Sequence, residues 1–461
     1  MTRATEPPTE QSGAGDQGAS AAAPAGRPNR KLSTAPYRGT RDFLPEEMSV
    51  RTQVFSRLFR TIETFGYLRY DGPTLEPVAL YEAKSSLEVV NDQMYRLTDR
   101  GGRELALRPE MTPTVARMIA ANAERLRFPA RWYSFIPCFR YERPQRGRVR
   151  EHWQINVDVF GSESPQAEVE LFELIHEMFA SLAVESSAYS VRVSDRVLLE
   201  GAFSRYAEVG AEQMRGVFRI LDRWSKVPRQ VIEESLDSLG LRPEQVRRVC
   251  EIATMSLDGI REAAGPETAA RSNLLKIFDE GLTEAPLVFD PLIVRAFEYY
   301  TSTVFEVYDT APENSRSLFG GGRYDNLVAL FSDRRIPGIG FALGDVTLFD
   351  FLQTHGALPE PDVNPHAVVL PVSPALRGTA KELARELRRA GLRTVLPPEL
   401  SGLSKDLREA ARQHAGFAVI VADDELARGN VIVRDLTRSE QVEVPLTQAA
   451  EHVDRALRAR H

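Results

Sequence analysis

The stretch FRYERPQRGRVREHWQINVDVFG, Phe139–Gly161, decides the fold that the chain is expected to take. Two β-rich segments, Tyr133–Arg140 and Ile155–Phe160, flank a loop with Pro144 and Gly147 as breakers and with four arginines. This pattern predicts two strands joined by a long basic hairpin loop. Such a loop suits an anionic ligand, for example a nucleotide or the end of a nucleic acid. A solvated surface hairpin is the simpler alternative, because a motif alone is a hypothesis.

The composition is that of a large globular chain. Its 461 residues suffice for two or three domains of roughly 100–200 residues each. The hydrophobic content of 43% supports sizeable cores. The net charge of −7 excludes wholesale polybasic binding of nucleic acid but leaves room for local basic patches such as the hairpin loop.

The cysteines and histidines give no sign of a metal site. Cys138 and Cys250 are isolated, and the seven histidines are scattered without an HExxH pattern. Two isolated thiols and the lack of a signal peptide predict a cytoplasmic location, and no apolar run approaches the roughly 18 residues of a membrane span.

Other segments give a coarse outline of the fold. Met1–Pro36 is rich in Ala, Pro, Gly, Ser and Thr, so we expect a disordered tail. Apolar residues at helical spacing predict a helix over Glu46–Phe65. The Gly-rich run in Ser317–Tyr324 suggests a turn that leads into a helix. From His366 onward, short apolar runs and helical patterns alternate in a βαβαβββα order, which predicts a compact α/β domain.

Several of these segments resemble the motifs of one enzyme family. Phe139–Gly161 resembles motif 2 of class II aminoacyl-tRNA synthetases, in the version of the histidyl-tRNA synthetase family. The helix followed by the proline-containing Tyr67–Val78 resembles motif 1, and PGIGFALGDVTLFDFL at Pro337–Leu352 resembles motif 3. RxxxYYxxTVFE from Arg295 and GGGRYD from Gly320 resemble the two signatures specific to the histidyl family. The resemblance covers nearly the whole chain after the first ~36 residues.

The resemblance implies an α/β fold with an α+β catalytic core. We expect an antiparallel-sheet class II catalytic domain over residues 37–197 and 285–357 and a helical insertion domain over 198–284. Residues 366–461 are expected to form a mixed-sheet α/β anticodon-binding domain. Motif 1 forms the dimer interface in this family, which implies a homodimer.

The function implied is that of a histidine–tRNA ligase. L-Histidine and ATP would form histidyl-adenylate and pyrophosphate, and histidine would then pass to the 3′ end of histidine tRNA. Chemistry of this kind requires positioning and neutralisation of charge more than a protein nucleophile, so arginines should carry it. Mg²⁺ would enter with ATP, and no other metal is expected.

The resemblance also implies roles for individual residues. The two catalytic arginines would be Arg140 and Arg295, both at the α-phosphate. Histidine would be bound by Glu110, Met111, Thr112, Gln154, Asp158, Tyr299 and Tyr300, with Asp158 and Tyr300 at the imidazole and Glu110, Thr112 and Gln154 at the amino end. ATP would be bound by Arg140, Glu142, Arg148 and His152, and the end of the tRNA by Arg143 and Gln145.

Some of these assignments have simpler explanations. Glu110 and Thr112 precede a helix and would serve equally as an N-terminal cap. Asp158 and Asn156 alternate on one strand, so both should point the same way into a polar cleft, although an ordinary half-exposed strand shows the same alternation.

The sequence departs from the family pattern at three places. Thr347 stands where motif 3 has an arginine that grips the ATP tail, RAFEYY replaces RGLDYY, and His152 replaces a phenylalanine that stacks on adenine. One lost arginine could slow activation without abolishing it, because a charged hydrogen bond contributes about 1.5–3 kcal/mol. Arg148, Arg323 or Mg²⁺ would then compensate.

A non-catalytic paralogue that binds histidine as a regulatory subunit is the alternative to the ligase. Such subunits typically lack an anticodon-binding domain and have a degraded motif 2, whereas this chain contains both features. The missing arginine at Thr347 favours the paralogue. A prolyl or threonyl ligase is disfavoured by the YYxxTVFE signature.

Overall fold

The computed structural model describes residues 31–82, 89–143, 147–294, 299–314 and 316–460. Its centre is an eight-stranded sheet in the order β1-β5-β6-β11-β10-β9-β7-β8, in which every pair is antiparallel except for the parallel outer pairs β1–β5 and β7–β8. In that order the strands are Leu68–Arg69, Ala130–Phe139, Glu151–Phe160, Gly338–Gly344, Ser317–Arg323, Thr303–Asp309, Tyr189–Asp195 and Leu287–Phe289. The predicted hairpin is therefore confirmed as β5 and β6, the second and third strands of the sheet.

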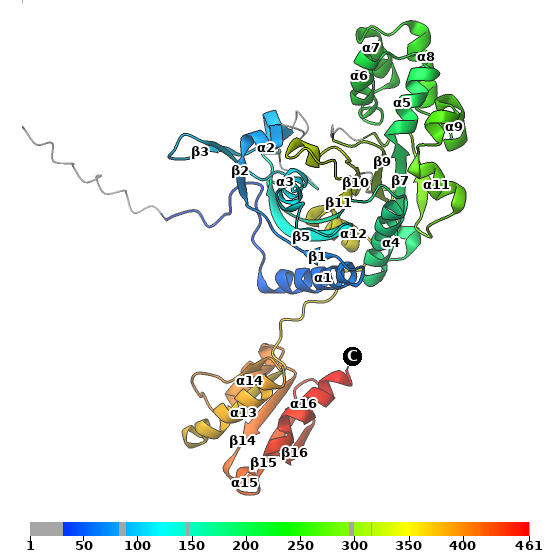
Figure 1. The fold of residues 1–461 in the computed structure, drawn as a ribbon. Coiled ribbons are helices and arrows are strands. Elements are labelled where there is room, and N and C mark those ends of the chain that lie inside the picture. Colours follow the sequence, from blue (N-terminus) through cyan, green and yellow to red (C-terminus); the bar gives the residue numbers. More distant parts are fainter. Residues whose placement is uncertain (1–30, 83–88, 144–146, 295–298, 315, 461) are drawn as a thin grey trace, which may run out of the picture.

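Three helices cover one face of this sheet (Figure 1). They are α1 (Pro45–Thr64), α4 (Gln166–Ser181) and α12 (Asp345–Thr354). Helix α1 forms where predicted, and its buried residues Val54, Leu58 and Ile62 recur at helical spacing. They join Phe172 of α4 and Phe351 of α12 in the largest hydrophobic core. This packing makes one face of the sheet rigid and leaves the other face for a site.

The opposite face carries α3 (Thr112–Asn122) and a small sheet. The small sheet has the order β2-β4-β3, formed by Leu75–Pro77, Glu104–Leu107 and Arg96–Thr98. A turn containing Gly101 and Gly102 joins β3 to β4, where the Asp99 side chain accepts hydrogen bonds from the backbone of Gly101 and Arg103. The segment Tyr67–Val78 alternates in sequence as a strand would, but it does not form one continuous strand, because only the short β1 and β2 form near its two ends.

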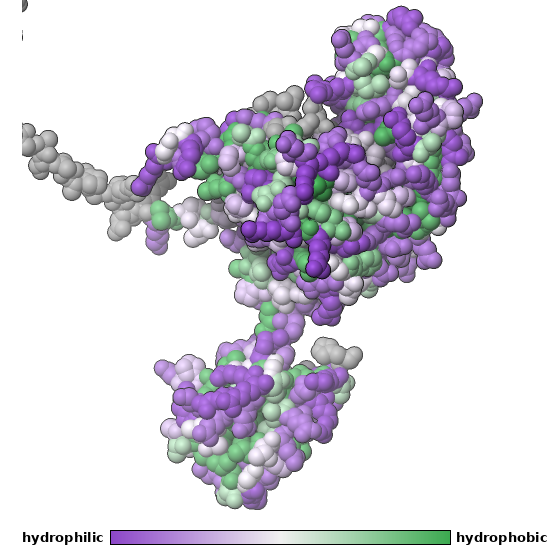
Figure 2. All heavy atoms as spheres, in the orientation of Figure 1, coloured by the Kyte–Doolittle hydropathy of each residue, from purple (hydrophilic) through white to green (hydrophobic). Residues whose placement is uncertain are grey.

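A helical segment follows β7 and has a hydrophobic core of its own (Figure 1). Its helices are α5 (Arg196–Arg205), α6 (Ala211–Leu221), α7 (Arg229–Ser238), α8 (Pro243–Ile252), α9 (Leu257–Ala264), α10 (Pro266–Ala269) and α11 (Asn273–Glu280). At its base, Ser272 donates a hydrogen bond of 2.5 Å to the buried Asp195. The visible surface of this segment is mostly hydrophilic (Figure 2).

The C-terminal residues form a separate α/β unit. The linker that connects it to the rest of the chain contacts α1. The sheet order is β13-β12-β14-β15-β16, parallel over the first three strands and antiparallel over the last three. These strands are Thr394–Val395, Ala367–Pro371, Phe417–Val421, Asn430–Asp435 and Gln441–Pro445. The helices are α13 (Arg377–Arg389), α14 (Leu403–Arg412), α15 (Asp423–Ala427) and α16 (Ala449–Arg458), so the predicted order is confirmed apart from the short α15.

The prediction for the glycine-rich run is wrong. Ser317–Arg323 is strand β10, in the middle of the large sheet, and only a single 3₁₀ turn, Val328–Leu330, follows it. The glycines are needed because neighbouring chains come too close for side chains: a Cβ on Gly321 would lie 2.1 Å from the carbonyl oxygen of Gly340. Glycine inside a strand often marks such a close approach.

Candidate active site

A cavity of about 140 Å³ opens on the same face of the large sheet on which α3 lies. The strand and helix residues around it come from segments far apart in the sequence. It is lined by Glu110, Thr112, Arg140, Gln154, Asn156, Asp158, Tyr299, Tyr300, Ser317, Phe319, Gly320, Tyr324, Gly340, Phe341 and Ala342. Six of the seven predicted histidine contacts are thus brought together with Arg140, which supports one small, polar binding site.

The hairpin β5–β6 positions the predicted polar residues. Its antiparallel register pairs Cys138 with His152 and Ile136 with Gln154, and the backbone NH of Arg140 donates to Arg150 O at 3.0 Å. Successive side chains of a strand alternate between its faces. Gln154, Asn156 and Asp158 therefore line the cavity together, as the alternation predicted.

Two buried polar atoms in this cavity have no partner within the described residues, Asn156 Nδ2 and Asp158 Oδ2. Both side chains are only 3% exposed. A buried polar group without a partner costs free energy, so a ligand with its own donor and acceptor would stabilise this arrangement. One free donor beside one free acceptor is a site for a polar ligand rather than an apolar one.

Asp158 is held by Tyr324, whose hydroxyl donates to Asp158 Oδ1. Burial raises the pKa of Asp158 to about 7, although the Tyr324 hydrogen bond acts in the lowering direction. Burial and the adjacent carboxylate both raise the pKa of Tyr324 well above its ordinary value, so Tyr324 stays a neutral donor. The carboxyl group therefore changes charge near neutral pH, where histidine imidazole also titrates.

The cavity is also lined by the residues predicted for the amino group, Glu110, Thr112 and Gln154. Tyr299 donates a hydrogen bond of 3.3 Å to the buried Glu110, and Thr112 begins α3. Cys138 Sγ donates to Gln154 Oε1 at 3.2 Å, and burial raises the pKa of Cys138 to about 12. The thiol is therefore neutral and serves to hold the Gln154 amide.

The residues predicted to bind the nucleotide lie on β6 and next to the loop end of the β5–β6 hairpin. Arg140 Nε donates to Pro109 O at 3.0 Å, and Arg148 lies 3.3 Å from the Glu142 carboxylate. Burial, together with the charges of Arg140 and Arg41, lowers the pKa of His152 to about 3. His152 is accordingly a neutral aromatic ring, which is the form that can stack on a base.

Of the other predicted site residues, two do not line the cavity and two lie outside the described part of the chain. Met111 is fully buried beneath the cavity with Ile136 and Cys138, so its side chain supports the floor and does not reach the ligand space. Arg143 is exposed on the hairpin. Arg295 and Gln145 lie outside the described residues.

The architecture and the site agree with the comparisons to known proteins. Residues 39–347 match the family model described as histidyl-tRNA synthetase. The chain belongs to the histidyl-tRNA synthetase family. Residues 366–455 match the model for an anticodon binding domain, so this member of the family carries both parts.

Relatives and solved structures extend over almost all of this synthetase-family chain. A histidine–tRNA ligase of Leptospira biflexa is 34% identical over 93% of the chain and 99% of its own length. One of Pyrococcus furiosus is 35% identical over 91% of the chain and 99% of its own length. The crystal structure of a histidyl-tRNA synthetase from Nostoc has a TM-score of 0.77 at 25% identity, covering 92% of this chain and 100% of that one.

The segment that resembles motif 3 contains Thr347, the residue expected to stand in place of the family arginine. Its hydroxyl donates to Leu318 O at 2.6 Å. Asp345, the first residue of α12, is fully buried and accepts from Arg41 at 2.9 Å, from Arg51 at 2.8 Å and from the backbone of Trp153 at 3.0 Å. The start of α12 is therefore tied both to the N-terminal segment and to β6.

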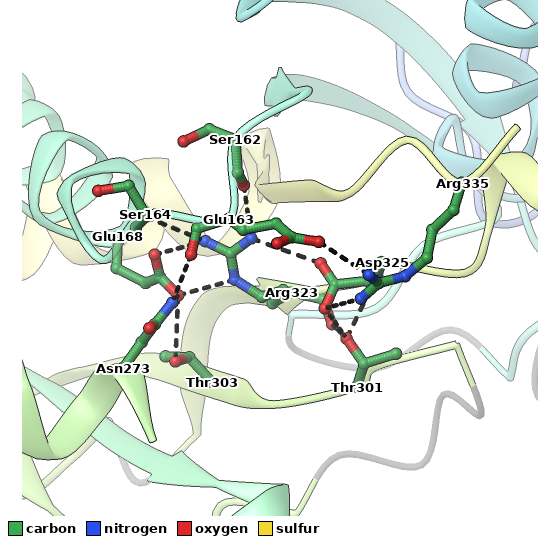
Figure 3. A network of polar contacts seen from close by, with 10 residues as sticks. All are labelled: Ser162, Glu163, Ser164, Glu168, Asn273, Thr301, Thr303, Arg323, Asp325 and Arg335. Carbon is green, nitrogen blue, oxygen red and sulfur yellow. Dashed lines mark hydrogen bonds and ion pairs between the residues drawn. The ribbon is translucent and has the colours of Figure 1, made fainter. Parts of the chain in front are cut away.

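The expectation that Arg323 could compensate for the missing arginine is wrong. Arg323 is 2% exposed, and its Nε and Nη2 bind the two Glu168 oxygens at 2.8 and 2.5 Å (Figure 3). The backbone oxygens of Ser162 and Ser164 accept its other donors. This ion pair joins β10 to α4 behind the cavity and leaves the guanidinium no path to ATP.

Two side chains that line the cavity, Tyr324 and Asn156, were assigned no binding role from the sequence. Tyr324 belongs to the GGGRYD signature, but only the folded chain brings its hydroxyl to Asp158. Asn156 was noted for its alternation with Asp158, and its unpaired amide nitrogen gives it a place in the site. The place of Tyr324 within the GGGRYD signature was the signal that could have identified it.

Proposed function

We infer that the protein is a histidine–tRNA ligase, which activates L-histidine with ATP and transfers it to the 3′ end of histidine tRNA. The observation that carries this inference is the polar cavity at Asp158 and Asn156, with Arg140 in its wall. The relatives over nearly the full length of the chain are ligases by name, and the anticodon-binding match disfavours the regulatory paralogue.

In the first step, the histidine carboxylate attacks the α-phosphorus of ATP and pyrophosphate leaves with the electrons of the broken P–O bond. Arg140 would neutralise charge at the α-phosphate, together with Arg295. Positive groups that are already in place stabilise the developing charge without reorganising. Mg²⁺ enters bound to ATP.

Recognition of histidine requires hydrogen-bond partners for the imidazole at one end of the molecule and for the ammonium group at the other. Asp158, held by Tyr324, accepts from an imidazole NH, and Tyr300 closes the same wall. Glu110, Thr112 and Gln154 surround the ammonium group. A site whose buried polar groups pair with the substrate rejects analogues without those groups by ~10⁴-fold or more.

The adenosine part of ATP is assigned to the outer hairpin. His152, which is neutral, stacks on adenine, Glu142 accepts from its amino group and Arg148 contacts the phosphates. In the second step a hydroxyl of the terminal tRNA ribose attacks the adenylate carbonyl and releases AMP. Arg143 and Gln145 would contact that end of the tRNA.

The broader organisation is also part of this proposal. Residues 37–197 and 285–357 form the catalytic domain, 198–284 a helical insertion against the acceptor arm, and 366–461 the anticodon-binding domain, after a tail over 1–36. The two motif 1 surfaces meet in a homodimer. A cytoplasmic location is part of the same proposal. None of the helices in the described ranges combines the length and hydrophobicity of a membrane span.

The test is transfer of labelled histidine to histidine tRNA by the purified full chain, beside Arg140→Ala. The account expects ATP-dependent charging by the wild type and a loss of about 100-fold or more in the variant, because one preorganised donor contributes on that scale. Histidine binding by calorimetry without any charging would instead support the regulatory paralogue.

A further inference from the structure

Helix α12 lacks the cation that the family places at motif 3. Its sequence, DVTLFDFLQT, contains neither Lys nor Arg. The Thr347 side chain is short, and its hydroxyl already donates to Leu318 O. Helix α12 therefore offers no positively charged side chain to a triphosphate bound next to the β5–β6 hairpin.

Arg41 brings a positive charge to the same edge from the N-terminal segment. Its Nη2 lies 2.9 Å from Asp345 Oδ2 and 3.4 Å from Glu151 O. The other Asp345 oxygen accepts from the backbone NH of Trp153 at 3.0 Å. Its own contact with Glu151, and the contact of its partner Asp345 with Trp153, place the guanidinium near His152, and its charge contributes to the lowered pKa of that ring.

Arg41 differs from its neighbour Arg51, which binds the same carboxylate oxygen. The Arg51 side chain is 8% exposed and lies over the Phe43 ring at 4.0 Å, so it is part of the packed interior. The Arg41 side chain also lies over the Phe43 ring, at 5.0 Å, but it is 29% exposed, and its buried Nε has no hydrogen-bond partner within the described residues. Two arginines on one carboxylate leave one positive charge in excess, and Arg41 is the one that a solute can reach.

We propose that Arg41 binds the phosphate tail of ATP and takes the place of the arginine that Thr347 replaces. The proposal rests on the proposed ligase function for the identity of the nucleotide. Asp345 holds the guanidinium in position, and Arg51 balances the charge of Asp345 so that Arg41 remains attractive to a polyanion. A guanidinium suits this task because its fork of donors matches phosphate oxygens.

Binding of ATP and of AMP to the full-length protein, both by calorimetry, tests this inference. Arg41→Gln keeps a hydrogen-bonding side chain at Asp345 but removes the charge. We expect its affinity for ATP to fall about 10- to 100-fold, on the scale of one charged hydrogen bond. Its affinity for AMP, which lacks the tail, should stay within twofold of the wild type.

A matched control and a reverse substitution sharpen the test. Arg131→Gln changes another partly exposed, ion-paired arginine of the same domain, paired with Glu170, and should leave both affinities unchanged. Thr347→Arg added to Arg41→Gln should recover ATP affinity. ATP affinity within twofold of the wild type in a folded Arg41→Gln protein, or equal losses for ATP and AMP, would overturn the proposal. Histidine-dependent pyrophosphate exchange by the wild type separately tests the ligase function, so the two failures are distinguishable.

Discussion

Asp158 and Glu168 are two buried carboxylates in consecutive elements, and their surroundings differ in kind. Glu168 accepts two hydrogen bonds from Arg323 and one each from Asn273 and Thr303 (Figure 3). Asp158 has Tyr324 on one oxygen and nothing on the other within the described residues. The first is a completed network and the second an incomplete one.

The difference separates a structural role from a functional one. A buried charge is tolerated when its partners are satisfied, and Glu168 meets that condition with an arginine on both oxygens. A carboxylate with a vacant oxygen in a cavity costs the free protein stability and offers that oxygen to a ligand. The substitutions below therefore should affect activity at Asp158 and stability at Glu168.

The largest effect is expected for Asp158→Asn. The amide keeps the size of the side chain but presents an NH₂ group to one side of the imidazole, so kcat/KM for histidine in pyrophosphate exchange should fall by about 10⁴-fold. The melting temperature should not fall. Asp195→Asn is the control, because Asp195 is also buried, with a pKa raised to about 6, but lies outside the cavity. Exchange within tenfold of the wild type would contradict the role of Asp158.

Glu168→Ala should act in the opposite way, on stability. It leaves the buried Arg323 with only one carboxylate contact among the described residues, that to Asp325 at 3.4 Å, and breaking a buried ion pair typically costs about 3–5 kcal/mol in the free energy of unfolding. Denaturant titration measures this loss. Glu163→Ala removes an exposed ion pair with Arg335 at the edge of the same network and should change stability by only about 0.5 kcal/mol or less. A comparable loss from both variants would remove the distinction.

The pH dependence of stability should reveal Asp158 in the ligand-free protein. Its folded pKa, about 7, is above its ordinary value, so the native state keeps a proton that the unfolded chain has released. Stability from this group is present at low pH and is lost as pH rises from about 4 through 7, at about 1.4 kcal/mol per unit. Asp195 contributes in the same direction. Melting curves of Asp158→Asn should therefore show a shallower fall over this interval, and an unchanged slope would argue against a buried, protonated Asp158.

A smaller effect is expected for Tyr324→Phe. The hydroxyl stabilises the ionised carboxylate, so its loss should raise the pKa of Asp158 by about one to two units, equivalent to the 1.5–3 kcal/mol of a charged hydrogen bond. The acidic limb of the pH profile of kcat/KM for histidine should move upward. Tyr299→Phe loses a hydroxyl that donates to Glu110 and should leave the position of this limb unchanged.

Much of the site was predictable because local patterns carry it. Gln154, Asn156 and Asp158 share one face through the period of two of a strand, and the breakers between the β-rich segments identify the hairpin. Glycines 320–322 were misassigned because glycine suits both a turn and a crowded strand, and only the packing of Gly340 against Gly321 distinguishes them. The pairs Arg323–Glu168 and Arg41–Asp345 join distant segments, so no local pattern predicts them.

Pyrophosphate exchange into ATP by the purified wild-type protein, with histidine and then with other amino acids, tests the central claim most directly. The account predicts exchange that requires histidine and that is lost in Asp158→Asn while the variant remains folded. Exchange that is absent with histidine, or that other amino acids support equally well, would contradict the claim that the cavity at Asp158 is the histidine site of a ligase.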